Sequence, residues 1–332
     1  MSRTGKAFIY KSGEGSNYKW VSDYKFPEPK KDDIQVKIIS AGLNPIDYKV
    51  PHMLPMWLAS KGSAVGKDIC GEVVAVGSGV TDVKPGDIVF GNGAGCAEYA
   101  TTKPYAIAKV PEGASDIPVY GGLGVAVGTA YQMLELAGAF TGTEPKNVMV
   151  IGASGGVGSA AVQIAKAKCP PGSKVAAICS AKSADYVKSI GVDSIIDYSQ
   201  PGFDFSKCAA EKSLDVVIDC VSSPDDYNYK PEGMKLLKAK TGQYVAANSA
   251  SGFDWVKLML GSAMGFKAFR GQYQLMFYRP TRECLEDMGR LVHGKKVNVN
   301  VQEYVAFEEG AIRKALETVA GRRVRGKLIV KM

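Results

Sequence analysis

The chain has 332 residues, of which 46% are hydrophobic and 22% are charged, a composition typical of globular proteins and not of disordered ones. At roughly 150 residues per domain, this length predicts about two domains. Lys and Arg outnumber Asp and Glu by 41 to 33, for a net charge of +8. This mild excess is typical of a solvated surface; the alternative is that it attracts an anionic ligand such as a dinucleotide phosphate. Nucleic acid is not expected as the main partner, although the charge does not exclude it.

No apolar run approaches the roughly 18 residues of a membrane-spanning helix. The N-terminus, MSRTGKAFIY, enters a strand-like segment without the apolar region or cleavage site of a secretory signal. The 7 cysteines form no C-x-x-C pair, which is typical of a reducing compartment. These features predict a soluble, cytoplasmic protein without a transmembrane segment. The 2 histidines, His52 and His293, are too few and too far apart for a zinc cluster, so we expect no metal site.

Residues 1–125 are predicted to be mostly β. Apolar alternation marks strands at Ile34–Ile39, Cys70–Val76 and Asp87–Phe90, and glycine and proline turns separate them. Pro85 and Gly86 form a strong turn signal just before the third strand. This first part therefore resembles a barrel-like or sandwich domain with few long helices.

From Gly128 the pattern changes to alternating strands and helices, which indicates a parallel, doubly wound sheet over residues 126–278. The predicted strands are 147–151, 175–179, 195–196, 215–219 and 243–247, and the predicted helices are 159–166 and 184–190. Residues 279–332 then carry helices at Arg282–Val292 and Glu308–Ala320 and a last strand at Lys327–Val330. An α/β layout in which this strand returns to the first domain is the simplest arrangement.

A glycine-rich turn separates the strand 147–151 from the following helix. Its spacing, G-x-x-G-G-x-G, is a variant of the dinucleotide-binding fingerprint. Glycine permits a left-handed backbone and close approach of a ligand, and the helix N-terminus suits a pyrophosphate. The turn is therefore predicted to bind a dinucleotide through Gly152, Ser154, Gly155, Gly156, Val157 and Gly158.

The end of the second predicted strand of this domain selects between the two nicotinamide cofactors. An NAD site usually has an acid there for the ribose 2′-hydroxyl, but here Ser180 and Lys182 follow the strand and the first acid is Asp185. A hydroxyl and a lysine suit a 2′-phosphate, so NADPH is favoured over NADH. The alternative is that Lys182 is simply a solvated loop lysine.

Several segments resemble the medium-chain dehydrogenase/reductase superfamily across essentially the whole chain. They are Asn44-Pro-Ile-Asp-Tyr-Lys49, Gly66–Gly77, Val83–Phe90, Gly128–Tyr131, Gly155–Gly158 and Gly326–Val330. Within it, the chain is most similar to the zinc-free quinone oxidoreductase (zeta-crystallin-like) branch. Zinc alcohol dehydrogenases have a cysteine where Asn44 lies and a His-Glu pair where Lys67 and Asp68 lie, and the ligands are missing here.

The resemblance implies a GroES-like β-barrel domain and a Rossmann-type domain with the active site between them, and reduction of quinones or α,β-unsaturated carbonyls by NADPH. It also implies a homodimer. It places Asn44 and Thr129 beside the nicotinamide, and Ser180, Lys182 and Tyr198 around the 2′-phosphate end. Asn248, Ser249 and Lys327 are implied to approach the cofactor as well, and Met53 and Trp57 to border the substrate pocket.

Reduction of a quinone or enone places negative charge on an oxygen, which needs a proton donor. Tyr48 and the Asn44 amide are the candidate catalytic groups, as are a backbone N–H and water. A structural role for Tyr48 in the barrel is an equal alternative. Asp47 is expected to orient the backbone of its own turn, and Lys49 to be solvated or ion-paired.

The aromatic and methionine-rich stretch Phe253–Tyr278 has two interpretations. It is either core plus a helix of the cofactor domain, or an apolar substrate entrance, membrane-surface patch or oligomer contact. Three functions stay open for the whole chain: a quinone or enone reductase, a reductase of one unsaturated lipid or secondary metabolite, and a non-catalytic NADPH-binding redox sensor or RNA- or partner-binding module.

Overall fold

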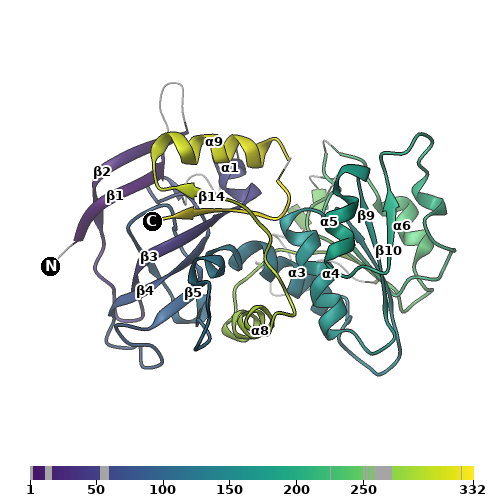
Figure 1. Cartoon of the computed structure of the whole chain (residues 1–332), viewed down its shortest axis with the longest axis horizontal. Helices are drawn as coiled ribbons and strands as arrows, with labels where there is room; N and C mark the ends of the chain where they lie inside the picture. Colours follow the sequence, from purple (N-terminus) through teal and green to yellow (C-terminus); the bar gives the residue numbers. More distant parts are fainter. Residues whose placement is uncertain are drawn as a thin grey trace. The chain divides into compact units, whose positions relative to one another are not determined.

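The computed structural model describes residues 3–11, 17–52, 60–224, 226–249, 251, 253–254, 256–257, 271–322 and 324–332. The chain divides into two compact units (Figure 1). The first unit consists of Met1–Gly128, Arg279–Gly294 and Val299–Met332, and the second of Thr129–Tyr278 and Lys295–Asn298. In the part of the chain described here, no helix has the length and apolar character needed to cross a membrane.

The first unit is built on a seven-stranded sheet of order β14-β15-β3-β4-β5-β7, with β6 beside β3. The strands are β3 (Ile34–Leu43), β4 (Asp68–Val76), β5 (Ile88–Asn92), β6 (Tyr99–Thr102), β7 (Ile107–Lys109), β14 (Val301–Ala306) and β15 (Lys327–Lys331). A separate hairpin pairs β1 (Arg3–Tyr10) with β2 (Tyr18–Phe26). The last strand, β15, pairs antiparallel with β3 and so lies in the sheet of the first unit.

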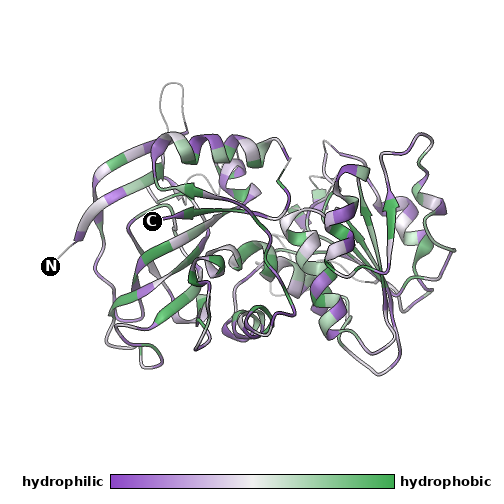
Figure 2. Ribbon diagram, viewed as in Figure 1, coloured by the Kyte–Doolittle hydropathy of each residue, from purple (hydrophilic) through white to green (hydrophobic). Residues whose placement is uncertain are grey.

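The first unit also contains helices in the part of the chain that the structure describes. They are α1 (Pro45–Lys49), α8 (Arg282–His293) and α9 (Glu309–Ala320). In α9 the buried residues are Ile312, Ala315, Leu316 and Val319, the spacing of an amphipathic helix, and Figure 2 shows the alternation of hydrophobic and hydrophilic residues along it. Both α8 and α9 lie where the sequence predicts helices.

Strand β14 was not predicted, and its burial pattern explains why. Of its six residues, Val305 is buried and the others are exposed or half-buried. It therefore lacks the apolar alternation from which a half-buried strand is recognised. Its place at the edge of the sheet, parallel to β15, accounts for this polarity.

The second unit contains a six-stranded sheet of order β10-β9-β8-β11-β12-β13, and all its strand pairs are parallel. This confirms the predicted doubly wound sheet. The strands are β8 (Asn147–Ile151), β9 (Lys174–Cys179), β10 (Ser194–Asp197), β11 (Val216–Asp219), β12 (Gln243–Ala246) and β13 (Tyr273–Leu275). Residues Val148–Ile151 are at most 1% exposed, as expected of a strand covered on both faces.

Helices lie on both sides of this sheet: α4 (Gly156–Lys168) and α5 (Ala184–Ser189) on one side and α6 (Lys230–Leu236) on the other (Figure 1). The helix α3 (Gly124–Leu136) precedes β8. Strand order reverses beside β8, whose neighbours are β9 and β11. In sheets of this type, ligands bind at the carboxyl ends of the strands where the order reverses. A ligand site is therefore expected at the loops after β8, β9 and β11.

Candidate functional site

The glycine turn after β8 has the backbone that its sequence predicts. Gly152 has a φ of +79°, in the left-handed region that favours glycine. Its N–H donates to the carbonyl of Ile178 at 3.0 Å, which ties the turn to β9. A Cβ at Gly158 would lie 2.2 Å from the Gly152 carbonyl oxygen, so the start of α4 packs too closely on the turn for any side chain there.

Gly155 differs from these two glycines. It is the N-cap of α4 with an ordinary extended backbone (φ −78°, ψ 173°), and a Cβ built on it would meet nothing closer than the Gly152 oxygen at 3.7 Å. The fold itself therefore has room for a side chain at this position. The methyl group of an alanine at Gly155 would occupy space at the N-terminus of α4, a thirteen-residue helix. The free backbone N–H groups at this end of the helix favour an anion. Ser154, Gly156 and Val157 are half-buried around the same turn.

The segments after β9 and β10 carry the residues predicted for the 2′-phosphate. Ser180 is half-buried, Lys182 is exposed and Tyr198 is 48% exposed. Asp197, at the end of β10, holds the two segments together: its carboxylate accepts from the N–H of Ala181 at 2.9 Å and from the side chain of Gln200 at 2.6 Å. These hydrogen bonds and two from Ser199 lower the pKa of Asp197, with the Ser199 hydroxyl as the largest cause.

The turn after β11 is fixed by an acid at the end of that strand. Asp219 is 1% exposed, and its Oδ1 accepts from the N–H groups of Val221 and Ser222 at 2.9 and 3.0 Å. The hydroxyl of Tyr244 donates to the other oxygen at 2.6 Å. Val221 then packs against the glycine turn, because its Cγ2 would lie 2.5 Å from a Cβ at Gly152.

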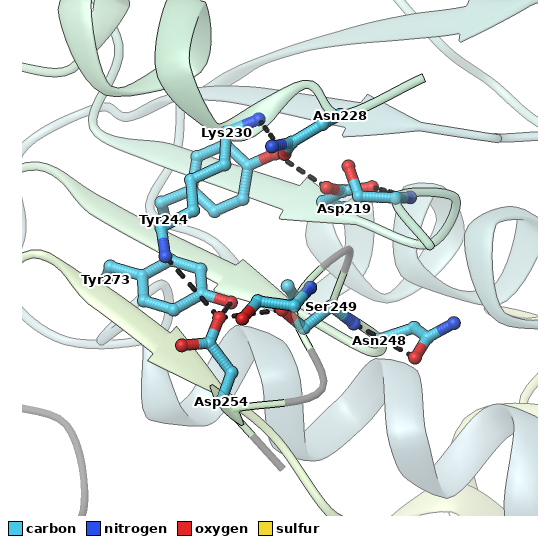
Figure 3. Close-up of a pocket in the computed structure, with 11 residues that line it drawn as sticks. Asp219, Asn228, Lys230, Tyr244, Asn248, Ser249, Asp254 and Tyr273 are labelled. Atoms are coloured by element: carbon cyan, nitrogen blue, oxygen red, sulfur yellow. Dashed lines mark hydrogen bonds and ion pairs between the residues drawn. The ribbon is translucent and has the colours of Figure 1, made fainter. Parts of the chain in front are cut away.

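A pocket of about 130 Å³ lies next to this turn (Figure 3). Two of the predicted site residues, Asn248 and Ser249, line it, directly after β12. The rest of the lining is mostly polar and comes from the turn after β11, α6, β12, β13 and the residues that follow Ser249. These other residues are Asp219, Ser222, Asn228, Lys230, Tyr244, Ala246, Ser251, Asp254 and Tyr273.

In the first unit, Asn44 and Lys327 are brought together in a buried cluster with Asp68. The Lys327 ammonium donates to Asn44 Oδ1 at 2.6 Å and to Asp68 Oδ2 at 3.1 Å. The Asn44 amide donates to the same Asp68 oxygen at 2.9 Å and to the carbonyl of Gly42 at 3.3 Å. All three side chains are at most 4% exposed. Asp68 was not among the predicted site residues, although it lies in the Gly66–Gly77 segment that carried the resemblance.

Asp68 also connects this cluster to the start of α3. Its Oδ1 accepts from the N–H of Val125 at 2.6 Å, and a Cβ at Gly124 would lie 2.6 Å from the same oxygen. The carboxylate is therefore shared between an ammonium, an amide and a helix N-terminus. This arrangement offsets the cost of burying its charge.

Asp47 orients its own turn, as the sequence predicts. Its Oδ2 accepts from the N–H of Asn44 at 2.8 Å, and its Oδ1 accepts from the hydroxyl of Tyr10 at 3.4 Å. The side chain is fully buried, and this burial raises the pKa of Asp47 to about 7. Asn44 is thus fixed through its backbone by Asp47 and through its side chain by Asp68 and Lys327.

Of the remaining predicted residues, the structure describes Tyr48 and Thr129. Tyr48 lies in α1, half-buried against the core of the first unit. Among the described residues, its hydroxyl has no hydrogen-bond partner. Thr129 is 8% exposed in α3. Met53 and Trp57 lie outside the described residues.

The stretch Phe253–Tyr278 is described in part. Leu275 is buried in β13, in agreement with the core interpretation, whereas Phe253 is 73% and Phe277 50% exposed. Residues 258–270 lie outside the described part of the chain.

Within the described ranges, no group of three or more His, Cys, Asp and Glu side chains could hold a metal ion.

Two family models match the chain. The alcohol dehydrogenase GroES-like domain matches residues 30–137, and a model described as zinc-binding dehydrogenase matches residues 190–330. These matches confirm the predicted fold class, a GroES-like domain with a Rossmann-type parallel sheet.

The proteins similar to this chain include named reductases. The chain is 30% identical over 318 residues to the chloroplast envelope quinone oxidoreductase homolog of Arabidopsis thaliana, covering 92% of this chain and 91% of that protein. It is 29% identical over 317 residues to the trans-enoyl reductase pgmF of Aspergillus terreus, covering 91% and 86%. The solved quinone oxidoreductase of Coxiella burnetii superposes with a TM-score of 0.80 at 26% identity, over 99% of this chain and 100% of that one.

Proposed function

Because the chain belongs to the quinone oxidoreductase-like branch of the medium-chain dehydrogenase/reductase superfamily, we propose that it is an NADPH-dependent reductase of quinones or α,β-unsaturated carbonyls that needs no metal ion. The observation that carries this proposal is the space at Gly155. The fold would accept a side chain there, so the glycine is explained by a ligand that approaches the N-terminus of α4. The pyrophosphate of a dinucleotide is such a ligand.

The choice of NADPH rests on the segments after β9 and β10. No acid follows β9 directly, and the acid that ends β10, Asp197, is already engaged by the N–H of Ala181 and by the side chain of Gln200. Lys182 is exposed beside this loop. An exposed ammonium suits the 2′-phosphate of NADPH better than the 2′-hydroxyl of NADH.

Independence from zinc is supported by the charges around Asp68. This carboxylate already has a cation, because the Lys327 ammonium lies 3.1 Å from its Oδ2. The neighbouring position 44 offers an amide, a weaker ligand for zinc than a thiolate or imidazole. A metal ion bound at Asp68 would be repelled by the buried ammonium.

Bound NADPH would supply a hydride to the acceptor, and a proton then completes the hydroquinone or the saturated carbonyl. The amide N–H groups of Asn44 are directed at Asp68 and Gly42, so Asn44 is better suited to a positioning role than to donating to the acceptor oxygen. Of the two proposed catalytic residues, Tyr48 is therefore the better candidate for the proton donor, through its hydroxyl.

The test is a fluorescence titration of the protein with NADPH and with NADH, followed by cofactor oxidation with a panel of benzoquinones, naphthoquinones, enones and enals. Tighter binding of NADPH and turnover of quinones or enones support the proposal. Binding without turnover across the panel would favour the non-catalytic sensor instead. A cytoplasmic location and a homodimer also remain predictions, to be checked by cell fractionation and by sedimentation of the purified chain.

A further inference from the structure

One carboxylate oxygen of Asp254, at the edge of the pocket in the second unit, contacts two hydroxyl groups and an ammonium. Its Oδ2 accepts from the hydroxyl of Ser249 at 2.7 Å and from the hydroxyl of Tyr273 at 3.2 Å. The ammonium of Lys230 lies 3.5 Å from the same atom. Figure 3 shows these side chains converging from α6, β13 and the segment after β12. A single carboxylate therefore joins three elements that are separate in the sequence.

Lys230 is held in place by more than its charge. Its ammonium lies 3.4 Å from the centroid of the Tyr273 ring, a cation–π contact that stabilises one orientation of a long, otherwise mobile side chain. The side chains of Lys230 and Asp254 are 37% and 14% exposed, so this ion pair is sheltered compared with a surface pair.

The residue held by this carboxylate, Ser249, is one of those predicted to approach the cofactor. Ser249 donates its hydroxyl to Asp254 and accepts from the N–H of Ser251 at 3.0 Å. Its own N–H donates to Asn248 Oδ1 at 2.9 Å. With the Ser249 hydroxyl fixed, both the backbone of this segment and the direction of the Asn248 side chain are fixed. The segment leaves the carboxyl end of β12, the edge of the sheet at which ligands of this fold bind.

We propose that Asp254, together with Lys230 and Tyr273, is a positioning group that holds the Asn248–Ser249 segment against the nicotinamide end of the cofactor. The inference rests on the proposed function, since it assumes that NADPH binds along this edge. Positioning residues act through the geometry of the reacting groups, and a displacement of about 1 Å can lower a rate by about 10²-fold. The adenosine end is assigned to other loops, so overall cofactor affinity depends less on Asp254 than turnover does.

The experiment measures kcat, the NADPH dissociation constant and amide hydrogen exchange in Asp254→Asn, Lys230→Met, Lys230→Arg and Tyr273→Phe. Asp254→Asn and Lys230→Met are expected to lower kcat by about tenfold or more while the NADPH dissociation constant changes by less than about threefold. Lys230→Arg, which keeps the positive charge, should retain most of the wild-type kcat. Lys207→Met is the matched control, because Lys207 pairs with Asp204 at 3.3 Å on the exposed surface of the same unit.

Amide exchange distinguishes a failure of the positioning role from a failure of the proposed function. In the cofactor-free protein, the amides of residues 247–249 and 251 should exchange about tenfold faster in Asp254→Asn than in the wild type. If the wild type reduces quinones but Asp254→Asn and Lys230→Met retain wild-type kcat and exchange, the positioning role is refuted. If the wild type reduces none of the acceptors, the proposed function fails. Faster amide exchange in Asp254→Asn would then still show that Asp254 orders the Asn248–Ser249 segment. Should Asp254→Asn not fold, Tyr273→Phe, which removes one hydroxyl, provides the same comparison.

Discussion

The ammonium of Lys327 lies 3.1 Å from Oδ2 of Asp68, across 259 positions of sequence, and the two side chains are 4% and 0% exposed. A buried pair of this kind is costly to break, because the remaining charge is left without a partner. The pair also holds Asn44, so it links the stability of the first unit to the geometry of its candidate site.

Lys327→Met is expected to lower the free energy of unfolding by about 3–5 kcal/mol. The reason is that Asp68 keeps a buried charge while losing its cation. The double variant Lys327→Met/Asp68→Asn should recover part of this loss, and urea unfolding of both proteins measures it. Lys103→Met serves as the control, since Lys103 pairs with Asp33 from an exposed position and its loss should lower the free energy of unfolding much less than the loss of Lys327. A loss in Lys327→Met no larger than in Lys103→Met would contradict the prediction.

Asp47 should make stability depend on pH. Burial raises its pKa in the folded protein from 3.8 to about 7. Between these values the unfolded chain releases a proton that the folded protein keeps, so stability should fall as pH rises from about 4 to about 7, by at most about 1.4 kcal/mol per pH unit from this group. Asp47→Asn keeps an acceptor for the N–H of Asn44 but cannot titrate. In urea unfolding from pH 4 to pH 8, the free energy of unfolding of Asp47→Asn should therefore rise relative to that of the wild type up to about pH 7, and the difference should then stay constant. A difference that is the same at every pH would exclude the titration of Asp47.

Two glycines of the same turn should respond in opposite ways to alanine. Gly158→Ala places a Cβ 2.2 Å from the Gly152 carbonyl oxygen and should cost about 1–3 kcal/mol of stability. Gly155→Ala has room in the fold and loses only the preference of a helix N-cap for glycine over alanine, so it should cost less than about 1 kcal/mol, while its NADPH dissociation constant rises by about tenfold or more. Thermal unfolding and cofactor fluorescence measure the two effects. Unchanged NADPH binding in Gly155→Ala would remove the main support for the cofactor site.

Lys182→Ala tests the choice of cofactor. Loss of one charge-assisted hydrogen bond to a phosphate should raise the NADPH dissociation constant by about tenfold, with little effect on NADH. Lys188→Ala is the control, because Lys188 is also exposed but lies in the last turn of α5. Equal changes in both variants would mean that Lys182 acts through general charge alone.

Tyr48→Phe removes the hydroxyl proposed as proton donor and keeps the ring that packs against the core. Turnover of a quinone should fall by about 10²-fold or more if the hydroxyl donates the proton, and NADPH binding and thermal stability should stay as in the wild type. Unchanged turnover would assign Tyr48 to packing alone.

The sequence predicts the second unit well because its signals are local. The apolar run of β8, the glycine turn and the small-residue helix α4 are contiguous, and each has a pattern that needs no knowledge of distant residues. The same holds for Asp47 and Asn44, which are three positions apart and share one turn. Strand β14 carries no such pattern, since its side chains face mostly outwards.

The groups that fix the candidate sites depend on contacts far apart in sequence. Lys327 meets Asp68 because β15 is placed beside β3, and Lys230 meets Asp254 because α6 covers the same part of the sheet from which that segment leaves. Nothing in the spacing of these residues indicates the pairs. One signal was present for Asp219, an acid at the end of the buried strand β11, where a carboxylate can accept from the N–H groups of the turn that follows.

Because β15 completes the sheet of the first unit, the order in which the chain is synthesised has a consequence for the site. Domains fold largely as units during synthesis, and all residues of the second unit precede Lys327 in the sequence. Asp68 and Asn44 leave the ribosome more than two hundred positions earlier and have no cation in their cluster until residues 327–331 follow. The nascent protein can thus fold its second unit while the carboxylate of Asp68 in the first unit still lacks its cation, and strand β15 then both joins that sheet and supplies the missing charge.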